Sequence, residues 1–429
     1  MKMSLKLGAI IVLGLMLQFN SLGSIVTQQD VFAMSWTTNS DTNLPYGRDS
    51  FAMVFDSKDG NFYMFGGWTD NTSSSYTNET WSYNPNTGVW TNLTTSNNPG
   101  DRGYIDGYYS PADNVFVIFG GTNDTYTYND TWYYHPDTNQ WENVTLNVMG
   151  SGEPNLSAYG AAYDNVHDIW LLLGGGPDYF TNFPNLWSFN TSTGWANLTS
   201  YLGPSGRTAP RMVYDALHDQ FVIHGGFDDI SGDYFFNETY TFDLNTKVFT
   251  LFNNTGLVTE GDSTFHYMNY DPVTQHIFMT AGNSSYVLDP SDYSWSNVTV
   301  TSPAELNFHR IVYNPAAKDF FMFSGYSNTN DLDYMQSWTL NVTGTPFYVP
   351  PSTTTTPSNT GGSSSSITST STSDTAGTSA QPSTSATSSP PSESSSTGAN
   401  PLPILTLTST ISILMVLMFG VKYVRKPKY

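Results

Sequence analysis

The sequence predicts an all-β protein built from six copies of a small four-stranded sheet. The first observation is a repeated aromatic pair, because NETWSYNPNTGVWTNLT at residues 78–94 is followed by NDTWYYHPDTNQWENVT at residues 129–145. The second is an apolar run, ending in two small residues, that recurs along the chain. The third is a composition with 15% Phe, Trp and Tyr, residues that favour strands. A fixed long period of this kind is typical of a repeat architecture.

The apolar runs mark one strand in each repeat. Each run follows a strand-like segment and a tight turn, as in FAMVFDSKDG, and precedes a polar loop with two more aromatic-containing strands. Each repeat is therefore expected to form four short strands. The runs end at Gly66 and Gly67, Gly120 and Gly121, Gly174 and Gly175, Gly225 and Gly226, then at Ala281 and Gly282, and at Ser324 and Gly325.

These units resemble kelch repeats, which share the glycine pair, the aromatic residue after it and the Trp that follows. The resemblance covers residues 31–343, although the glycine pair is broken in units five and six. It implies a six-bladed β-propeller in which each blade is a four-stranded antiparallel sheet. The physical interpretation agrees, because a small twisted sheet cannot bury both faces alone and must pack against neighbours around an axis.

The second Trp of each repeat is interpreted as packing between blades. The glycine pairs are expected to let the neighbouring blade approach closely, because glycine has no side chain. Trp36 precedes Arg48 by the same spacing that separates Trp90 from Arg102, so Trp36 is expected on an outermost strand. The structural tryptophans are Trp36, Trp90, Trp141, Trp195 and Trp295.

The sixth unit supplies only three strands, so the ring needs a fourth from elsewhere. We expect residues 31–38 to complete blade six and to fasten the N-terminal segment to the last repeat. The alternative is a strand around Phe347, but the flanking Pro346 and Pro350 make that a poor strand.

A recurring arginine is the main candidate for ligand binding. Arg48, Arg102 and Arg207 share one position near the predicted channel mouth, on the face with the long loops, and His266 and His309 lie three residues past its equivalents. Two interpretations stay open. Converging guanidinium groups could bind a carboxylate or another anion, or the arginine could be a structural element of the repeat that holds the loops by hydrogen bonds.

Other chemistry is not expected. The chain has no cysteine and no Gly-x-Ser-x-Gly motif, which argues against thiolate chemistry and a serine-hydrolase site. His167 and His218 fall in matching turns on the short-turn face, and no histidine pair has metal-ligand spacing, so neither a metal site nor a cofactor is expected. The formal charge of −22 argues against nucleic acid as a partner.

The two ends predict display at a cell surface. Residues 1–23 have the layout of a secretory signal peptide, with a retained anchor as the alternative. Residues 344–400, rich in Ser, Thr and Pro, are expected to form a disordered stalk. Residues 401–421 fit one transmembrane helix and residues 422–429 a basic cytoplasmic tail; a sorting signal that is replaced by a lipid anchor fits the same pattern. We expect a single-pass membrane protein with an extracellular propeller.

Asn-x-Ser/Thr sequons recur at fixed places in the repeats, which predicts glycans on the propeller rim. Chance is the alternative, because the chain is rich in Ser and Thr. One group lies just after the second Trp and the other just before the first aromatic residue. They are Asn92, Asn143, Asn197 and Asn297, and Asn78, Asn129, Asn237 and Asn283.

Two functions follow from these features. The first is an extracellular binding or adhesion module that recognises a carbohydrate or a protein through the long-loop face. The second is an extracellular enzyme acting on an acidic sugar at the channel mouth, similar to the sialic-acid mutarotases, which are also six-bladed kelch proteins. In that alternative the three arginines would clamp the anion, and His266, His309 or Asp49 would act as general acid or base.

Overall fold

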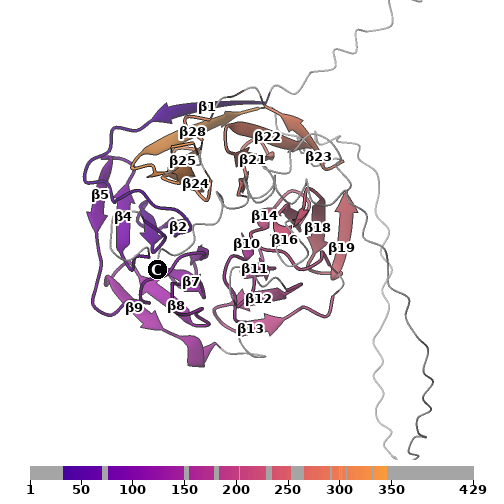
Figure 1. Cartoon of the computed structure of the whole chain (residues 1–429), viewed down its shortest axis with the longest axis horizontal. Coiled ribbons are helices and arrows are strands. Elements are labelled where there is room, and N and C mark those ends of the chain that lie inside the picture. The colour runs from indigo at the N-terminus through magenta and orange to yellow at the C-terminus, as the bar shows by residue number, and fades with distance from the viewer. Residues whose placement is uncertain are drawn as a thin grey trace, which may run out of the picture. The chain divides into compact units, whose positions relative to one another are not determined.

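The computed structural model describes residues 32–344 except 70–75, 149–153, 178–182, 202, 229–233, 253–264, 290–291, 299, 301, 306, 328 and 331. Six four-stranded antiparallel sheets surround a central axis, which confirms the predicted all-β six-bladed propeller (Figure 1). One 3-10 turn, Thr145–Asn147, is the only helical segment among the described residues, and none of them forms an apolar helix long enough to span a membrane. The expected signal peptide and transmembrane helix lie outside the described residues.

Blades one to three are each made of four consecutive strands. Blade one contains β2 (Ala52–Phe55), β3 (Phe62–Phe65), β4 (Thr80–Asn84) and β5 (Val89–Asn92). Blade two contains β6 (Gly107–Ser110), β7 (Val115–Phe119), β8 (Thr131–His135) and β9 (Gln140–Asn143). Blade three contains β10 (Gly160–Asp164), β11 (Ile169–Leu173), β12 (Leu186–Asn190) and β13 (Gly194–Asn197).

Blades four and six each carry an extra two-stranded hairpin in the loop after their second strand. Blade four contains β14 (Arg211–Asp215), β15 (Gln220–His224), β18 (Thr239–Asp243) and β19 (Val248–Phe252), with the hairpin β16 (Phe227–Asp228) and β17 (Tyr234–Phe235). Blade five contains β20 (Tyr267–Tyr270), β21 (Ile277–Ala281), β22 (Ser284–Asp289) and β23 (Ser294–Asn297). Blade six contains β24 (Arg310–Asn314), β25 (Asp319–Phe323) and β28 (Ser337–Thr343), with the hairpin β26 (Tyr326–Ser327) and β27 (Leu332–Asp333).

The N-terminal strand β1 (Ala33–Thr38) completes blade six, as predicted. It pairs antiparallel with β28, placing Trp36 opposite Leu340, and the sheet order is β1-β28-β25-β24. Figure 1 shows β1 along the outer side of β28. The ring is therefore closed by joining the first and last described strands of the chain.

The tryptophans pack between blades, which confirms their predicted role. Trp141 is 2% exposed and its indole Nε1 donates to the Thr80 hydroxyl of the preceding blade at 2.9 Å. Trp195 makes the same bond to Thr131 at 3.0 Å, and Trp295 makes it to Thr239 at 2.9 Å. These three indoles thus fill apolar space between two sheets and satisfy their one donor across the boundary.

The glycine pairs allow the close approach that the sequence predicted. The Gly67 amide donates to the Arg102 carbonyl of the next blade at 2.9 Å, and a Cβ on Gly66 would lie 2.6 Å from that same oxygen. The Gly121 amide repeats the bond to Leu156 at 3.1 Å. A side chain at the first glycine would therefore push neighbouring blades apart.

Candidate functional site at the long-loop face

A ring of backbone hydrogen bonds surrounds the start of the innermost strands. The Ser50 amide donates to the Phe308 carbonyl at 3.3 Å, linking blade one to blade six, and the Ala158 amide donates to the Tyr104 carbonyl at 3.0 Å. The Ala209 amide continues the pattern to the Ala158 carbonyl at 2.7 Å. These residues come from the same position in different blades, so this ring surrounds one end of the propeller axis on the long-loop face, the position predicted for the channel mouth.

The residues of this ring adopt an unusual backbone conformation. Ser50, Tyr104, Ala158, Ala209 and Phe308 have φ between 50° and 56°, in the left-handed region that residues with a side chain rarely enter. Each such residue costs on the order of 1–3 kcal/mol and persists only where its surroundings hold it there. The channel mouth is therefore a strained backbone ring, stabilised by contacts between blades.

Aromatic side chains collect on one part of this ring. The Phe308 ring lies 4.2 Å from the Phe265 ring and 6.2 Å from the Tyr104 ring, between ring centroids. Phe227 extends the group, with its centroid 5.8 Å from that of Phe265, and Phe235 lies next to Phe227. We call Tyr104, Phe227, Phe235, Phe265 and Phe308 the aromatic rim. Tyr104 and Phe308 are half-buried, so part of each ring faces solvent.

A charged layer follows the rim, two residues further along the inner strands. Arg310, which is 3% exposed, comes from blade six, and its Nε and Nη2 atoms donate to the carbonyls of Phe51 at 2.7 Å and Ile105 at 2.6 Å. Its Nη2 also lies 3.6 Å from a carboxylate oxygen of Asp106, and its buried Nη1 has no hydrogen-bond partner. Arg310 therefore ties blade six to blades one and two.

Tyr267 lies between two arginines of this layer. The guanidinium carbons of Arg310 and Arg211 are 5.1 Å and 5.6 Å from its ring centroid. Burial raises the pKa of Tyr267 to about 12, and Asp106 acts in the same direction while the two arginines oppose it. Tyr267 is thus a neutral hydroxyl at physiological pH and is no candidate for a general base.

The sequence did not single out the aromatic rim or the two inner arginines. The sequence did contain a pattern that indicates the two arginines, because Arg211 and Arg310 both begin innermost strands. However, only a closed ring shows that equivalent positions in distant repeats meet at one axis.

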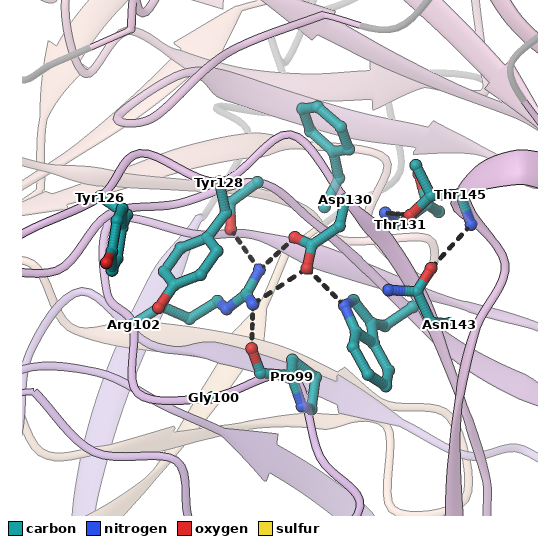
Figure 2. Close-up of polar contacts among 12 residues, drawn as sticks. Pro99, Gly100, Arg102, Tyr126, Tyr128, Asp130, Thr131, Asn143 and Thr145 are labelled. Carbon is teal, nitrogen blue, oxygen red and sulfur yellow. Dashed lines mark hydrogen bonds and ion pairs between the residues drawn. The ribbon is translucent and has the colours of Figure 1, made fainter.

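The recurring arginines Arg48, Arg102 and Arg207 lie close to this mouth in sequence but are buried at 0–1% exposure. Figure 2 shows the Arg102 guanidinium held between the Asp130 carboxylate and the Pro99 carbonyl. Its Nη1 is 2.5 Å from Asp130 Oδ1 and 3.0 Å from the Gly120 carbonyl, and its carbon lies 3.7 Å from the Tyr128 ring centroid. The described partners of the Arg102 side chain all belong to its own blade and the loop leading into it.

Arg48 and Arg207 repeat this arrangement in blades one and four. Arg48 Nη2 lies 2.6 Å from Glu79 Oε2, and Nη1 donates to the Gly66 carbonyl at 3.2 Å. Arg207 Nη1 donates to the Gly225 carbonyl at 3.0 Å and lies 3.7 Å from Glu238. These contacts favour the structural interpretation, in which each arginine ties the incoming loop to the glycine pair. The ligand-binding interpretation stays a prediction.

Burial and the charge of the partner both shift the pKa values of Arg48 and Glu79. Burial lowers the pKa of the Arg48 guanidinium, although Glu79 opposes this. Burial by itself would raise the pKa of Glu79, but the charge and hydrogen bonds of Arg48 outweigh it, so the pKa of Glu79 lies below its usual range. The Glu79 carboxylate is therefore charged at neutral pH.

The two candidate histidines are enclosed rather than open to a channel. His266 and His309 are 1% and 2% exposed, and His309 Nε2 lies 2.8 Å from the Thr280 hydroxyl of blade five. Both residues immediately precede an innermost strand. Their described surroundings are the boundaries between blades.

The regular sequons have a structural explanation. At three of the four sites before the first aromatic residue, all except Asn283, the acidic residue pairs with the arginine and the Thr hydroxyl accepts the Trp indole, as Asp130 and Thr131 do. In the other group, Asn143 Oδ1 accepts the Thr145 amide at 3.1 Å and the Thr145 hydroxyl accepts the Thr131 amide at 3.0 Å (Figure 2). The regular spacing therefore gives no independent support for glycans. Glycosylation stays a prediction; Asn92, Asn143, Asn197 and Asn297 are exposed.

Repeated blades, glycine pairs that contact the next blade, and indoles that bond across three of the blade boundaries are the shared features of this propeller. A family model described as the KLHDC2/KLHL20/DRC7 Kelch-repeats domain matches residues 14–207. This match covers somewhat less than half of the chain, and together with the six observed blades it supports a kelch-repeat β-propeller.

Proposed function

We propose that this protein is a binding module displayed at a cell surface, which recognises a protein or a carbohydrate through the aromatic rim. One observation carries the proposal: Tyr104 and Phe308 are partly exposed aromatic residues held in a strained backbone conformation at the channel mouth. Strained residues cluster at functional sites, and aromatic side chains are enriched among the residues that dominate binding energy. The kelch-repeat match supports a protein partner.

Binding can be tested on the full chain with two probes, a phage-displayed random-peptide library and a glycan array. The Tyr104→Ala/Phe308→Ala double variant should lose binding to the peptides or glycans that the wild type selects. Val166→Ala is the control, because Val166 is 65% exposed in a turn on the opposite face. If the double variant folds and binds as wild type does, the rim is not the binding surface.

The enzyme alternative receives less support from the described contacts. It needs Arg48, Arg102 and Arg207 in an open pocket beside His266 or His309, and all five side chains are at most 2% exposed. NMR measurement of anomeric exchange in N-acetylneuraminic acid checks this. We expect the chain to leave the exchange rate unchanged, and an acceleration that is lost on Arg48→Met would favour the enzyme.

Surface display rests on sequence patterns outside the described residues. The signal pattern at residues 1–23, the stalk at 344–400, the apolar run at 401–421 and the basic tail at 422–429 all support it. Protease treatment of intact cells should remove the propeller and leave a small fragment that retains a C-terminal tag. Full protection of the propeller would contradict surface display, and loss of the tag from the mature chain would favour the lipid-anchor alternative.

A further inference from the structure

Three metal-ligand atoms meet where blades three and four adjoin on the short-turn face. His167 Nδ1 lies 2.7 Å from Asp164 Oδ2 and 3.6 Å from Asp219 Oδ1, and the three groups offer ligand atoms within 4.8 Å of one another. Asp164 ends β10 and His167 lies in the turn between β10 and β11, whereas Asp219 comes from the turn between β14 and β15. The group is therefore assembled from two blades.

Groups outside the cluster hold both carboxylates in place. Asp219 Oδ1 accepts the Tyr214 hydroxyl at 2.7 Å, and its Oδ2 accepts the Asn245 side-chain amide at 3.2 Å. Asp164, at 1% side-chain exposure, uses Oδ1 to accept the Val166 amide at 2.8 Å, which leaves Oδ2 directed at His167. Hydrogen-bond partners that fix the orientation of the ligand side chains in this way are expected at a metal centre.

The cluster is also open to entry. The side chains of His167 and Asp219 are 41% and 47% exposed, while Asp164 forms the buried base. Two carboxylates face one imidazole, so the group is negatively charged when His167 is neutral. This arrangement attracts a cation in a chain with a net charge of −22.

We propose that Asp164, His167 and Asp219 form a binding site for a divalent first-row transition ion such as Zn²⁺. One imidazole nitrogen and two carboxylate oxygens suit zinc and its neighbours, and three protein ligands leave a position for water. The ion would replace the proton now shared by His167 and Asp164. Their ligand atoms would separate from 2.7 Å to about 3.3 Å, the spacing set by metal–ligand bonds of about 2.0–2.1 Å. A bound ion would cross-link the two blades.

The next boundary provides a matched comparison inside the same chain. His218 Nδ1 lies 2.8 Å from Asp215 Oδ2, the same pair as in blade three. The residue equivalent to Asp219 is Gln275, and both have a left-handed backbone, with φ of 54° and 62°. An amide replaces the third carboxylate there, so the boundary between blades four and five should not bind the ion.

The experiment is isothermal titration of untagged, EDTA-treated full chain with ZnCl₂ at neutral pH. We expect one saturable site, lost in His167→Gln and weakened in Asp219→Asn, because each change removes a ligand atom. His218→Gln should leave binding unchanged. Gln275→Asp should supply the missing ligand beside His218 and raise the stoichiometry from one ion to two.

Unfolding is not expected to confound these variants, because the side chains of His167, His218 and Asp219 are all more than one third exposed. Circular dichroism and thermal unfolding without metal check this. Zn²⁺ should raise the melting temperature of the wild type and not that of His167→Gln, because a ligand that binds only the folded state stabilises it. Absence of saturable binding, or binding that His167→Gln does not change, would overturn the proposal.

Discussion

Blade two and blade six are both four-stranded sheets packed between neighbouring blades, but they are assembled from different segments of the chain. Blade two takes four consecutive strands, buries Trp141 to 2% exposure and holds Arg102 against Asp130. Blade six takes its outer strand from the other end of the chain, and the Trp36 on that strand is only partly buried. A blade formed by neighbouring strands is stabilised by its buried indole, whereas the closing blade depends more on backbone pairing.

The closing contacts support this difference. Strand β1 aligns six residues with β28, from Ala33 opposite Thr343 to Thr38 opposite Trp338. The Gln336 side-chain amide donates to the Asn39 carbonyl at 2.9 Å, just beyond the pairing. Ladder hydrogen bonds of this kind depend little on side-chain identity, so the closure should tolerate substitutions that a blade interior does not.

The largest expected effect is the difference in stability between alanine substitutions of Trp141 and Trp36. Trp141→Ala should lower the free energy of unfolding by about 3–5 kcal/mol, because it leaves a large cavity between blades. Trp36→Ala should cost under about 2 kcal/mol, because its side chain is partly exposed already. Urea denaturation of the two variants measures both. Equal losses would show that the closing strand is anchored by its indole after all.

The next effect concerns the arginine that ties a blade to its incoming loop. Arg102→Met should cost about 3 kcal/mol, since removing one partner of a buried ion pair leaves the other without compensation. The Arg102→Met/Asp130→Asn double variant should recover part of that loss, which a double-mutant cycle in urea quantifies. Additive losses would mean that the ion pair contributes nothing and that Arg102 acts by packing alone.

A smaller effect depends on pH and distinguishes blade four from blade two. His224 in blade four occupies the place of Phe119, and burial lowers the pKa of His224 to about 3, with Arg207 adding to the shift. Below about pH 6.5, His224 binds a proton in the unfolded chain but not in the folded chain. The free energy of unfolding therefore falls from about pH 6.5 toward pH 3. At pH 5 the loss should reach about 2 kcal/mol.

His224→Phe removes this titration. The variant should differ most from wild type at pH 5 and least at pH 8, as measured by denaturation midpoints at both pH values. A difference that is the same at both pH values would show that His224 is not kept neutral by burial.

The smallest expected effect is the loss of stability at acid pH when Glu79, the partner of Arg48, becomes protonated. Because the pKa of Glu79 is lowered in the folded state, its contribution is complete above about pH 4.3 and is lost as the pH falls through the lowered value. Glu79→Gln should remove that part of the acid dependence while keeping the hydrogen bond from Trp81. Melting temperatures across the acid range test this, and an unchanged acid slope would contradict it.

Much of the fold could be predicted from local patterns. The glycine pairs, the repeated indoles and the turn residues each act within one repeat, so the sequence reports them directly. The closure by residues 31–38 followed from a missing strand in the sixth unit, and the pairing of Trp36 with Leu340 confirms it. The role of the glycines was predictable because only a residue without Cβ permits such a close approach.

The candidate site was less predictable. Arg48, Arg102 and Arg207 stood out because they recur, yet the ion pairs of their side chains lie within their own blades. The aromatic rim was missed because Tyr104 and Phe308 are separated by four repeats and share no motif. The His167 cluster was missed because its third ligand belongs to another blade.

The sequence by itself determined the number of sheets, the order of their strands and the residues that fill the spaces between them. Each of these depends on hydrophobic periodicity and glycine placement within a short stretch of chain, which sequence order preserves. Only the tertiary structure decided which side chains meet at the axis and across blade boundaries. Ring closure brings together positions that are distant in the chain, and no local pattern encodes their separation or their burial.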